Sequence, residues 1–337
     1  MIIICLFVAV SHLRTIRLYR MTYILLYLLC LVTLTISSSI RLNRDEDGYF
    51  GIRTTLLSPP AITATEIFIM TAFSDENWID ADTHPLLVTS NTSNVSLVIL
   101  DTGEDLVVPM PMIMDSRPNN HSTDWIIGLN PGSSTIEQFG PITIRSDATD
   151  FEVAEMFLYS SRNFFETICF PNSTIHFPHE TGQSFVETNV SFWVAVGDDQ
   201  EHITSQSRLI ISNLENFHVL GVPRSVRSTI VGVMTELGAQ EHSPGSNLFS
   251  DCLHAMMTDD LPPIILHLAL PSGEAQIVVD SLDYLTFFEE QEYCYLGLSV
   301  IDESSAERNF AAIDFFKLQD IHLHISSSGI SICDSAL

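Results

Sequence analysis

The feature that most constrains the fold is a series of short apolar runs that begins near residue 45 and continues almost to the C-terminus. The runs are separated by Pro, Gly, Asn, Asp and Ser, which are residues that favour turns. Short apolar runs at this close spacing indicate strands rather than helices. The clearest examples are residues 66–70, 95–100, 125–129, 192–196, 208–211, 263–268 and 321–325. The sequence therefore predicts an all-β fold.

One segment, residues 223–240, has a helical pattern instead. Pro223 stands at the expected first turn, and Val226, Ile230 and Met234 follow at steps of three or four residues. The chain is 46% hydrophobic and only 17% charged, whereas disordered chains combine low hydrophobicity with high charge. We therefore expect a folded protein with few helices.

The N-terminal residues 1–39 have the pattern of a signal peptide. A basic stretch that ends at Arg20 precedes an apolar run from Met21, and small residues follow at 37–39. The apolar run is shorter than the roughly 20 residues that span a bilayer. We expect cleavage, with Met21 as an alternative start. Only an uncleaved signal anchor, which is the alternative, would attach the chain to a membrane.

Charge excludes one class of partner. The chain has 42 acidic and 14 basic residues, a net charge of −28, and Lys317 is its only lysine. Nucleic-acid binding requires clustered Lys and Arg that displace counterions, so we expect no nucleic-acid partner. No phosphate loop, dinucleotide fingerprint or Gly-x-Ser-x-Gly motif is present in the sequence, and no cofactor is predicted.

Two further patterns favour the secretory pathway. Five N-glycosylation sequons begin at Asn91, Asn94, Asn120, Asn172 and Asn189. Beyond the leader the chain has an even set of cysteines, Cys169, Cys252, Cys294 and Cys333, which an oxidising compartment would pair. The protein is therefore expected to be extracellular or in the endolysosomal lumen. His322 and His324 have metal-ligand spacing, but no third ligand is recognisable and we predict no metal.

The final third of the chain carries a resemblance to a known family. Its segments begin with Leu261-Pro-Pro-Ile-Ile-Leu-His-Leu and continue through 275–284, 293–298, 312–325 and 329–332. In this order they resemble the C-terminal lobe of the pepsin-like aspartic proteases, particularly the plant nepenthesins and xylanase inhibitors. The resemblance implies a bilobal fold with an N-terminal lobe at 46–187, which has a shortened flap region, and a C-terminal lobe at 188–335. It also implies the disulfides Cys252–Cys294 and Cys169–Cys333.

The family's two catalytic segments resemble residues 66–79 and residues 208–226 of this chain. In this alignment Thr71 and Ser212 stand at the two aspartate positions, and Phe73 and Leu214 replace the glycines that follow. Ile313 replaces the glycine of the second apolar-apolar-Gly segment, whereas Gly128 retains the first. Peptide hydrolysis in this family uses two carboxylates that share a proton. A hydroxyl does not titrate in their place, so the sequence predicts no catalytic residues.

An alternative is an active aspartic endopeptidase that uses Asp101. The sequence Asp101-Thr102-Gly103 follows two apolar residues and matches the catalytic motif by itself. However, too few residues separate it from the segment at 124–133 to hold the flap and helix that the family has there. We therefore favour a non-catalytic relative that acts as a binding or inhibitor-type protein, as plant xylanase inhibitors of this family do. Its partner would be an unknown protein or peptide in the cleft between the lobes.

Overall fold

The computed structural model describes fifteen segments of the chain: 39–44, 49–56, 65–74, 77–80, 94–99, 105–109, 112–114, 125–147, 150–180, 186–196, 199–214, 217–257, 260–288, 292–301 and 310–334. The chain divides into two units, Met1–Ser39 and Ile40–Leu337, and the fold belongs to the second. The expected signal peptide lies outside the described residues up to Ser38. Within the described segments no helix has the length and apolar character needed to cross a membrane.

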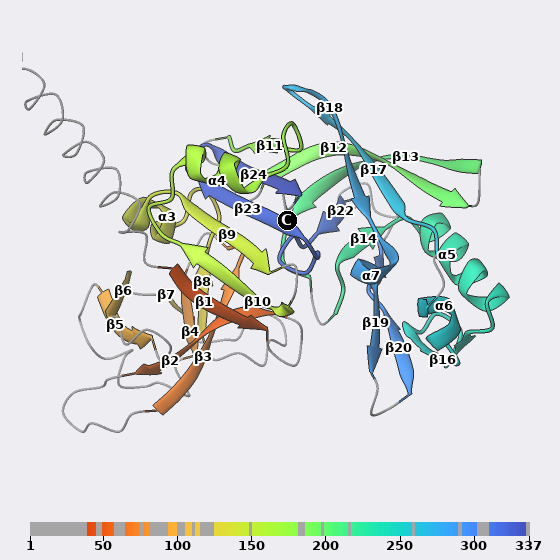
Figure 1. The fold of residues 1–337 in the computed structure, drawn as a ribbon, viewed down its shortest axis with the longest axis horizontal. Helices are drawn as coiled ribbons and strands as arrows, with labels where there is room; N and C mark the ends of the chain where they lie inside the picture. The colour runs from red at the N-terminus through yellow and green to blue at the C-terminus, as the bar shows by residue number, and fades with distance from the viewer. Residues whose placement is uncertain are drawn as a thin grey trace, which may run out of the picture. The chain divides into compact units, whose positions relative to one another are not determined.

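The largest sheet of the described residues has thirteen strands (Figure 1). Eleven of them follow the order β11-β24-β23-β9-β10-β1-β2-β3-β8-β4-β7, while β5 pairs with β2 and β6 with β5. The strands are β1 (Ser39–Arg44), β2 (Phe50–Leu56), β3 (Thr65–Ala72), β4 (Trp78–Asp80), β5 (Asn94–Ile99), β6 (Asp105–Pro109), β7 (Met112–Met114), β8 (Trp125–Gly128), β9 (Ile142–Asp147), β10 (Asp150–Phe157), β11 (Ile175–Pro178), β23 (Ile321–Ser326) and β24 (Gly329–Asp334).

Two smaller sheets follow. A seven-stranded sheet has the order β18-β17-β12-β13-β22-β14-β21, and a four-stranded sheet the order β15-β16-β20-β19. Their strands are β12 (Val186–Val196), β13 (Asp199–Ile211), β14 (Leu220–Val222), β15 (Gln240–Glu241), β16 (Leu248–Ser250), β17 (Ile264–Leu270), β18 (Gly273–Val279), β19 (Leu285–Phe288), β20 (Tyr293–Leu296), β21 (Leu298–Val300) and β22 (Phe310–Ile313). The all-β prediction is confirmed.

The described helices are short: α3 (Ser134–Phe139), α4 (Arg162–Ile168), α5 (Arg224–Glu236), α6 (Leu253–Met257) and α7 (Ser281–Tyr284). Helix α5 is the helix predicted from the sequence. Val226, Ile230 and Met234 form its buried face, and Pro223 is its N-cap residue. The chain leaves the helix through Gly238, whose φ of 99° favours glycine.

The last two strands return to the first sheet. Strand β23 pairs with β9, and β24 pairs with β11. Residues 321–334 therefore join the sheet built by the first half of the chain, although they follow the strands of the seven-stranded sheet in sequence. The expected boundary between lobes at residue 187 falls within β12. The return pairs strands that are far apart in the chain.

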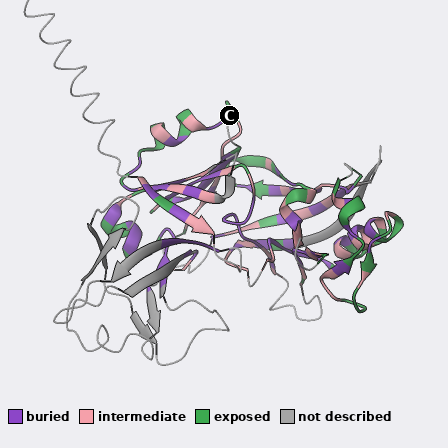
Figure 2. Cartoon of the chain, turned by 60° about the horizontal axis from the view of Figure 1, so that its bottom comes forward, coloured by how far each residue is buried: buried purple, intermediate pink, exposed green. Residues whose placement is uncertain are grey.

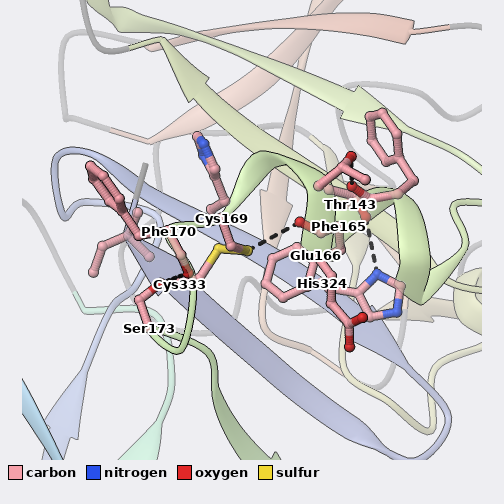
Figure 3. The surroundings of a disulfide bond; sticks show 12 residues. Thr143, Phe165, Glu166, Cys169, Phe170, Ser173, His324 and Cys333 are labelled. Carbon is pink, nitrogen blue, oxygen red and sulfur yellow. Dashed lines mark hydrogen bonds between the residues drawn. A yellow bond between two sulfur atoms is a disulfide. The ribbon is translucent and has the colours of Figure 1, made fainter. Parts of the chain in front are cut away.

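Both disulfides that the resemblance implied are present. Cys169, at the C-terminal end of α4, bonds Cys333 in β24, with 5.6 Å between their Cα atoms (Figure 3). Cys252, just before α6, bonds Cys294 in β20, with 6.1 Å between their Cα atoms. Buried residues, purple in Figure 2, are concentrated along the strands. They include residues of all three sheets, such as Ile52, Phe192 and Phe249, in a single core cluster.

Candidate functional site

The first loop of the candidate site follows β3. Thr71 lies near the end of that strand, where it pairs with Ile127 of the parallel strand β8. Its side chain is only 2% exposed, and its Oγ1 donates a hydrogen bond of 2.9 Å to the backbone oxygen of Phe50. The hydroxyl at the expected aspartate position is therefore directed into the sheet as a structural donor.

Phe73 fills the position expected for the first glycine. It is 7% exposed, and its ring centroid lies 4.4 Å from that of Phe316, which belongs to the segment that follows β22. A glycine would leave this volume free for close backbone approach, whereas here two aromatic rings occupy it. The first loop is consequently held by apolar packing against a segment from the other end of the chain.

The second loop follows β13. The amide of Ser212 donates to the oxygen of Ile313 at 3.1 Å, which extends the ladder between β13 and β22 by one bond. The Ser212 hydroxyl donates to the backbone oxygen of its neighbour Asn213 at 3.0 Å. The Ser212 hydroxyl is therefore also bonded to a nearby backbone oxygen, and it is neutral where an aspartate would carry a negative charge.

The two loops meet through a residue that the sequence analysis did not single out. The Phe73 amide donates a 3.0 Å hydrogen bond to Oδ1 of Asn213. Thr71 and Ser212 bond elsewhere, so the contact between the loops is made by the residues beside the expected aspartate positions. Asn213 stands where a Ser or Thr follows the aspartate in the family motif, and its polar side chain was the only signal that could have indicated this role.

The two expected aspartate positions differ in their register within their sheets, Thr71 in the pairing of β3 with β8 and Ser212 after the pairing of β13 with β22. Thr71 lies one residue before Ala72, the partner of Gly128, whereas Ser212 lies one residue after Ile211, the partner of Ile313. Relative to the paired residues Gly128 and Ile313, the two expected aspartate positions are therefore offset from each other along their strands. This offset does not restore a carboxylate, because residues 69–73 and 210–214 contain no Asp or Glu. With or without this offset, neither expected aspartate position holds a carboxylate.

A buried carboxylate lies next to the second loop. Asp314 is 1% exposed; its Oδ2 accepts from the amide of Leu214 at 3.1 Å and its Oδ1 from the amide of Phe316 at 3.2 Å. Nζ of Lys317 lies 3.8 Å from Oδ2. Burial raises the pKa of Asp314, while Lys317 and the two amides oppose this rise. Both oxygens are engaged, so this carboxylate serves the loop as an acceptor.

Lys317, the only lysine of the chain, completes this arrangement. Its Nζ donates to the backbone oxygen of Leu214 at 2.5 Å and lies 4.1 Å from the centroid of the Tyr49 ring. The Tyr49 hydroxyl donates to the same oxygen at 2.9 Å. Asp314 and Lys317 therefore bind the amide and the carbonyl of Leu214, the residue at the second glycine position. The sequence signal for this pair was a lysine three residues after an aspartate, in a segment whose other residues are apolar.

The remaining expected residues fall in different places. Asp101, in the connection between β5 and β6, lies outside the described residues. Asn91 and Asn120 also lie outside them. Asn94 is the first residue of β5. Asn172 and Asn189 are both exposed, Asn172 in a turn after α4 and Asn189 in β12. The two described side chains are thus accessible for a glycan.

His322 and His324 are buried in β23 and make structural hydrogen bonds. Nδ1 of His324 lies 3.0 Å from Oγ1 of Thr143, and its ring stacks on Phe165 at 5.3 Å (Figure 3). Nδ1 of His322 lies 3.4 Å from Oγ of Ser146. Burial lowers the pKa of each histidine to about 4. Over the described part of the chain, no group of three or more His, Cys, Asp or Glu side chains is placed to hold a metal ion.

The sequence matches no protein-family model, and no curated protein is significantly similar to it. Its structure is similar to the crystal structure of basic 7S globulin from soybean, with a TM-score of 0.55 and 12% identity over 89% of this chain and 98% of that chain. At this identity the likeness shows the fold alone, which is a mostly-β, pepsin-like fold. The two disulfides are of the kind that forms in an oxidising compartment.

Proposed function

We propose that the protein is a non-catalytic secretory protein with the pepsin-like fold that acts by binding another protein or a peptide. The observation that carries this proposal is the pair of loops at Thr71 and Ser212. Both carry hydroxyls at the expected aspartate positions, and no acidic residue lies within two positions of either. The partner would occupy the cleft between the lobes that the fold family implies.

The chemistry of peptide hydrolysis supports this proposal. One carboxylate must remove a proton from water while a second donates a proton to the substrate carbonyl. The hydroxyls of Thr71 and Ser212 do not titrate in the range where such carboxylates work, and each is committed to a backbone oxygen. Asp314 is buried with both oxygens bonded, so it is not free to activate water at these loops.

The finer localisation is part of the same proposal. We expect the mature chain, without residues 1–39, to be extracellular or in the endolysosomal lumen and to carry N-linked glycans. The exposed side chains of Asn172 and Asn189 support attachment at these two sequons. The masses of the secreted protein before and after enzymatic removal of N-glycans test this expectation, and an unchanged mass would contradict it.

The decisive test of the non-catalytic role is a proteolysis assay of the purified secreted protein. An unfolded protein substrate is incubated with it at acid pH, with and without a pepstatin-type inhibitor, beside pepsin as a positive control. We expect no inhibitor-sensitive cleavage from this chain. The alternative, an endopeptidase that uses Asp101, predicts cleavage that the inhibitor blocks and that Asp101→Asn abolishes, and this result would overturn the proposal.

A further inference from the structure

A second surface, separate from the two loops, has the features of a peptide-binding site. It is a groove of about 880 Å³ between β18, the turn after α4 and the ends of β23 and β24. Residues 274–278 of β18 form one wall, and residues 172–175 together with 332–334 form the other. The volume is in the range of known ligand sites, roughly 300 to 1,000 Å³. We call this feature the β18 groove.

The wall formed by β18 is the edge of a sheet. Among the described strands β18 pairs only with β17, so it is the outer strand of the seven-stranded sheet. Side chains of a strand alternate between its two faces, yet five consecutive residues, 274–278, line the groove. A consecutive run indicates that the groove follows the strand's edge. The backbone N–H and C=O groups on that edge are those that an added strand would pair with.

The opposite wall also contains an edge strand. Strand β11, which begins at Ile175, pairs only with β24 among the described strands and ends the thirteen-stranded sheet. Ile175 and the preceding turn line the β18 groove. The disulfide between Cys169 and Cys333 fixes this turn to β24 (Figure 3). The groove therefore has a rigid wall facing the edge of β18, which favours binding without reorganisation.

All charged side chains of the described residues that line the β18 groove are acidic. Four exposed carboxylates line it, those of Glu274, Asp280, Asp320 and Asp334. A fifth, Asp283, is partly buried and accepts hydrogen bonds from the amides of Gln319 and Asp280. None of the described residues that line the groove is Lys, Arg or His. This field attracts cationic side chains and repels acidic ones.

Apolar side chains are exposed among these carboxylates. Phe170 and Val278 are each 49% exposed and Leu282 is 55% exposed, and all three line the groove. Large apolar side chains that share a concave surface with polar groups are typical of recognition sites. The groove therefore offers three kinds of contact: a strand edge that pairs with no other described strand, a carboxylate rim and an apolar surface.

We propose that the β18 groove binds an extended segment of a partner protein, rich in basic and apolar side chains, which adds as a strand to the edge of β18. Backbone hydrogen bonds to β18 would hold the segment, and its Lys or Arg side chains would meet Glu274, Asp320 and Asp334. Phe170, Val278 and Leu282 would cover its apolar side chains. This binding does not depend on the loops at Thr71 and Ser212, so its failure and the failure of the non-catalytic role are separate results.

The test uses a fluorescein-labelled octapeptide of alternating lysine and valine, with binding followed by fluorescence anisotropy. Binding is measured both for the secreted protein itself and for Asn172→Gly, which removes any glycan from this groove residue and tolerates its φ of 66°. Each variant below is made in both backgrounds. The test variant combines Glu274→Gln with Asp320→Asn. Asn tolerates the φ of 55° that Asp320 adopts. The matched control combines Glu137→Gln and Glu236→Gln, which remove two exposed carboxylates on α3 and α5.

We expect saturable binding of the probe. The test variant should lower the affinity about tenfold and the control variant less than about twofold, since each exposed charge pair adds only a modest binding free energy. The same octapeptide methylated at every second backbone nitrogen keeps its charge but loses half of its backbone N–H donors. It should bind at least about tenfold more weakly, because backbone hydrogen bonds hold an added strand. Bound unmethylated probe should also slow hydrogen exchange of amides within Gly273–Val279. Absence of binding, equal weakening by the two variants, or equal affinity for the methylated probe would overturn the proposal.

Discussion

The two loops of the candidate site occupy related places in the fold and are held by different forces. The loop after β3 is fixed by the buried hydroxyl of Thr71 and by the ring of Phe73 against Phe316. The loop after β13 is fixed by two buried charges, Asp314 and Lys317, which bind the backbone of Leu214. The charged groups of the second loop therefore hold its backbone, and this role agrees with the proposed non-catalytic function.

Side chains also occupy the two positions where the family resemblance implied glycines. A catalytic loop must let substrate and water reach its carboxylates, whereas Phe73 is packed and Leu214 is bonded through both its amide and its carbonyl. If the protein has no catalytic aspartates, as we propose, side chains at the glycine positions carry no catalytic penalty. The following predictions test whether the first loop depends on packing and the second on charge.

The largest effect is expected at Asp314. Asp314→Asn keeps an acceptor for the amide of Leu214 but leaves the buried Lys317 without its counter-charge, which should lower the unfolding free energy by about 3–5 kcal/mol. Urea unfolding measures this change. The double variant Asp314→Asn with Lys317→Met removes the unpaired charge and should recover much of the loss. A single variant as stable as the parent would show that the second loop does not depend on charge.

The first loop should respond to packing. Phe73→Ala removes a buried ring and should cost about 3 kcal/mol of unfolding free energy, as other core phenylalanine truncations do. The control is Phe170→Ala, whose ring is 49% exposed and whose loss should cost about 0.5 kcal/mol. Equal unfolding midpoints for the two variants would contradict the packing role of Phe73.

Acid should distinguish the two regions. Burial, assisted by Arg145 for His322 and by Arg162 and His176 for His324, lowers both histidine pKa values to about 4 against 6.5, although Glu166 opposes the shift of His324. The unfolded chain therefore binds these protons first, and stability falls as the pH drops from about 6.5 to about 4, by on the order of 2 kcal/mol per histidine. Asp314 has the opposite effect on stability. Burial raises its pKa, so the folded state binds a proton more readily than the unfolded chain and the contribution of Asp314 to stability rises as the pH falls.

Urea unfolding across this pH range checks the acid effect. His322→Gln with His324→Gln should flatten the loss of stability below neutral pH, whereas the exposed control His254→Gln should leave it unchanged. The sheet that carries β23 and the first loop would then be the acid-sensitive region. A steep loss that persists in the double variant would assign acid sensitivity to other groups.

The smallest effect is expected at Thr71. Thr71→Val removes the donor to the buried oxygen of Phe50 with little change in volume, and should cost about 1 kcal/mol. Thr235→Val is the control, because its hydroxyl bonds the oxygen of Val231 on the exposed face of α5. Thr71→Val should therefore lower the unfolding midpoint more than Thr235→Val does. The reverse order would remove the structural role assigned to the Thr71 hydroxyl.

The sequence predicted what depends on local pattern. Short apolar runs separated by turn residues predicted strands such as β17 and β23, and three- and four-residue spacing predicted α5. The order of segments in the final third led to the fold class through its resemblance to a family. The contacts of the site depend on distant pairs instead: 140 residues separate Phe73 from Asn213, and 100 separate Leu214 from Asp314. Periodicity carries no information on such pairs, so it also missed the offset of the loops and the β18 groove.

Calorimetric titration with pepstatin at acid pH tests the central claim most directly. Inhibitors of this type mimic the transition state between two catalytic carboxylates, so their affinity depends on that pair. Our account predicts no heat of binding for this protein under conditions in which pepsin binds stoichiometrically. Tight, saturable binding that Asp101→Asn abolishes would contradict it.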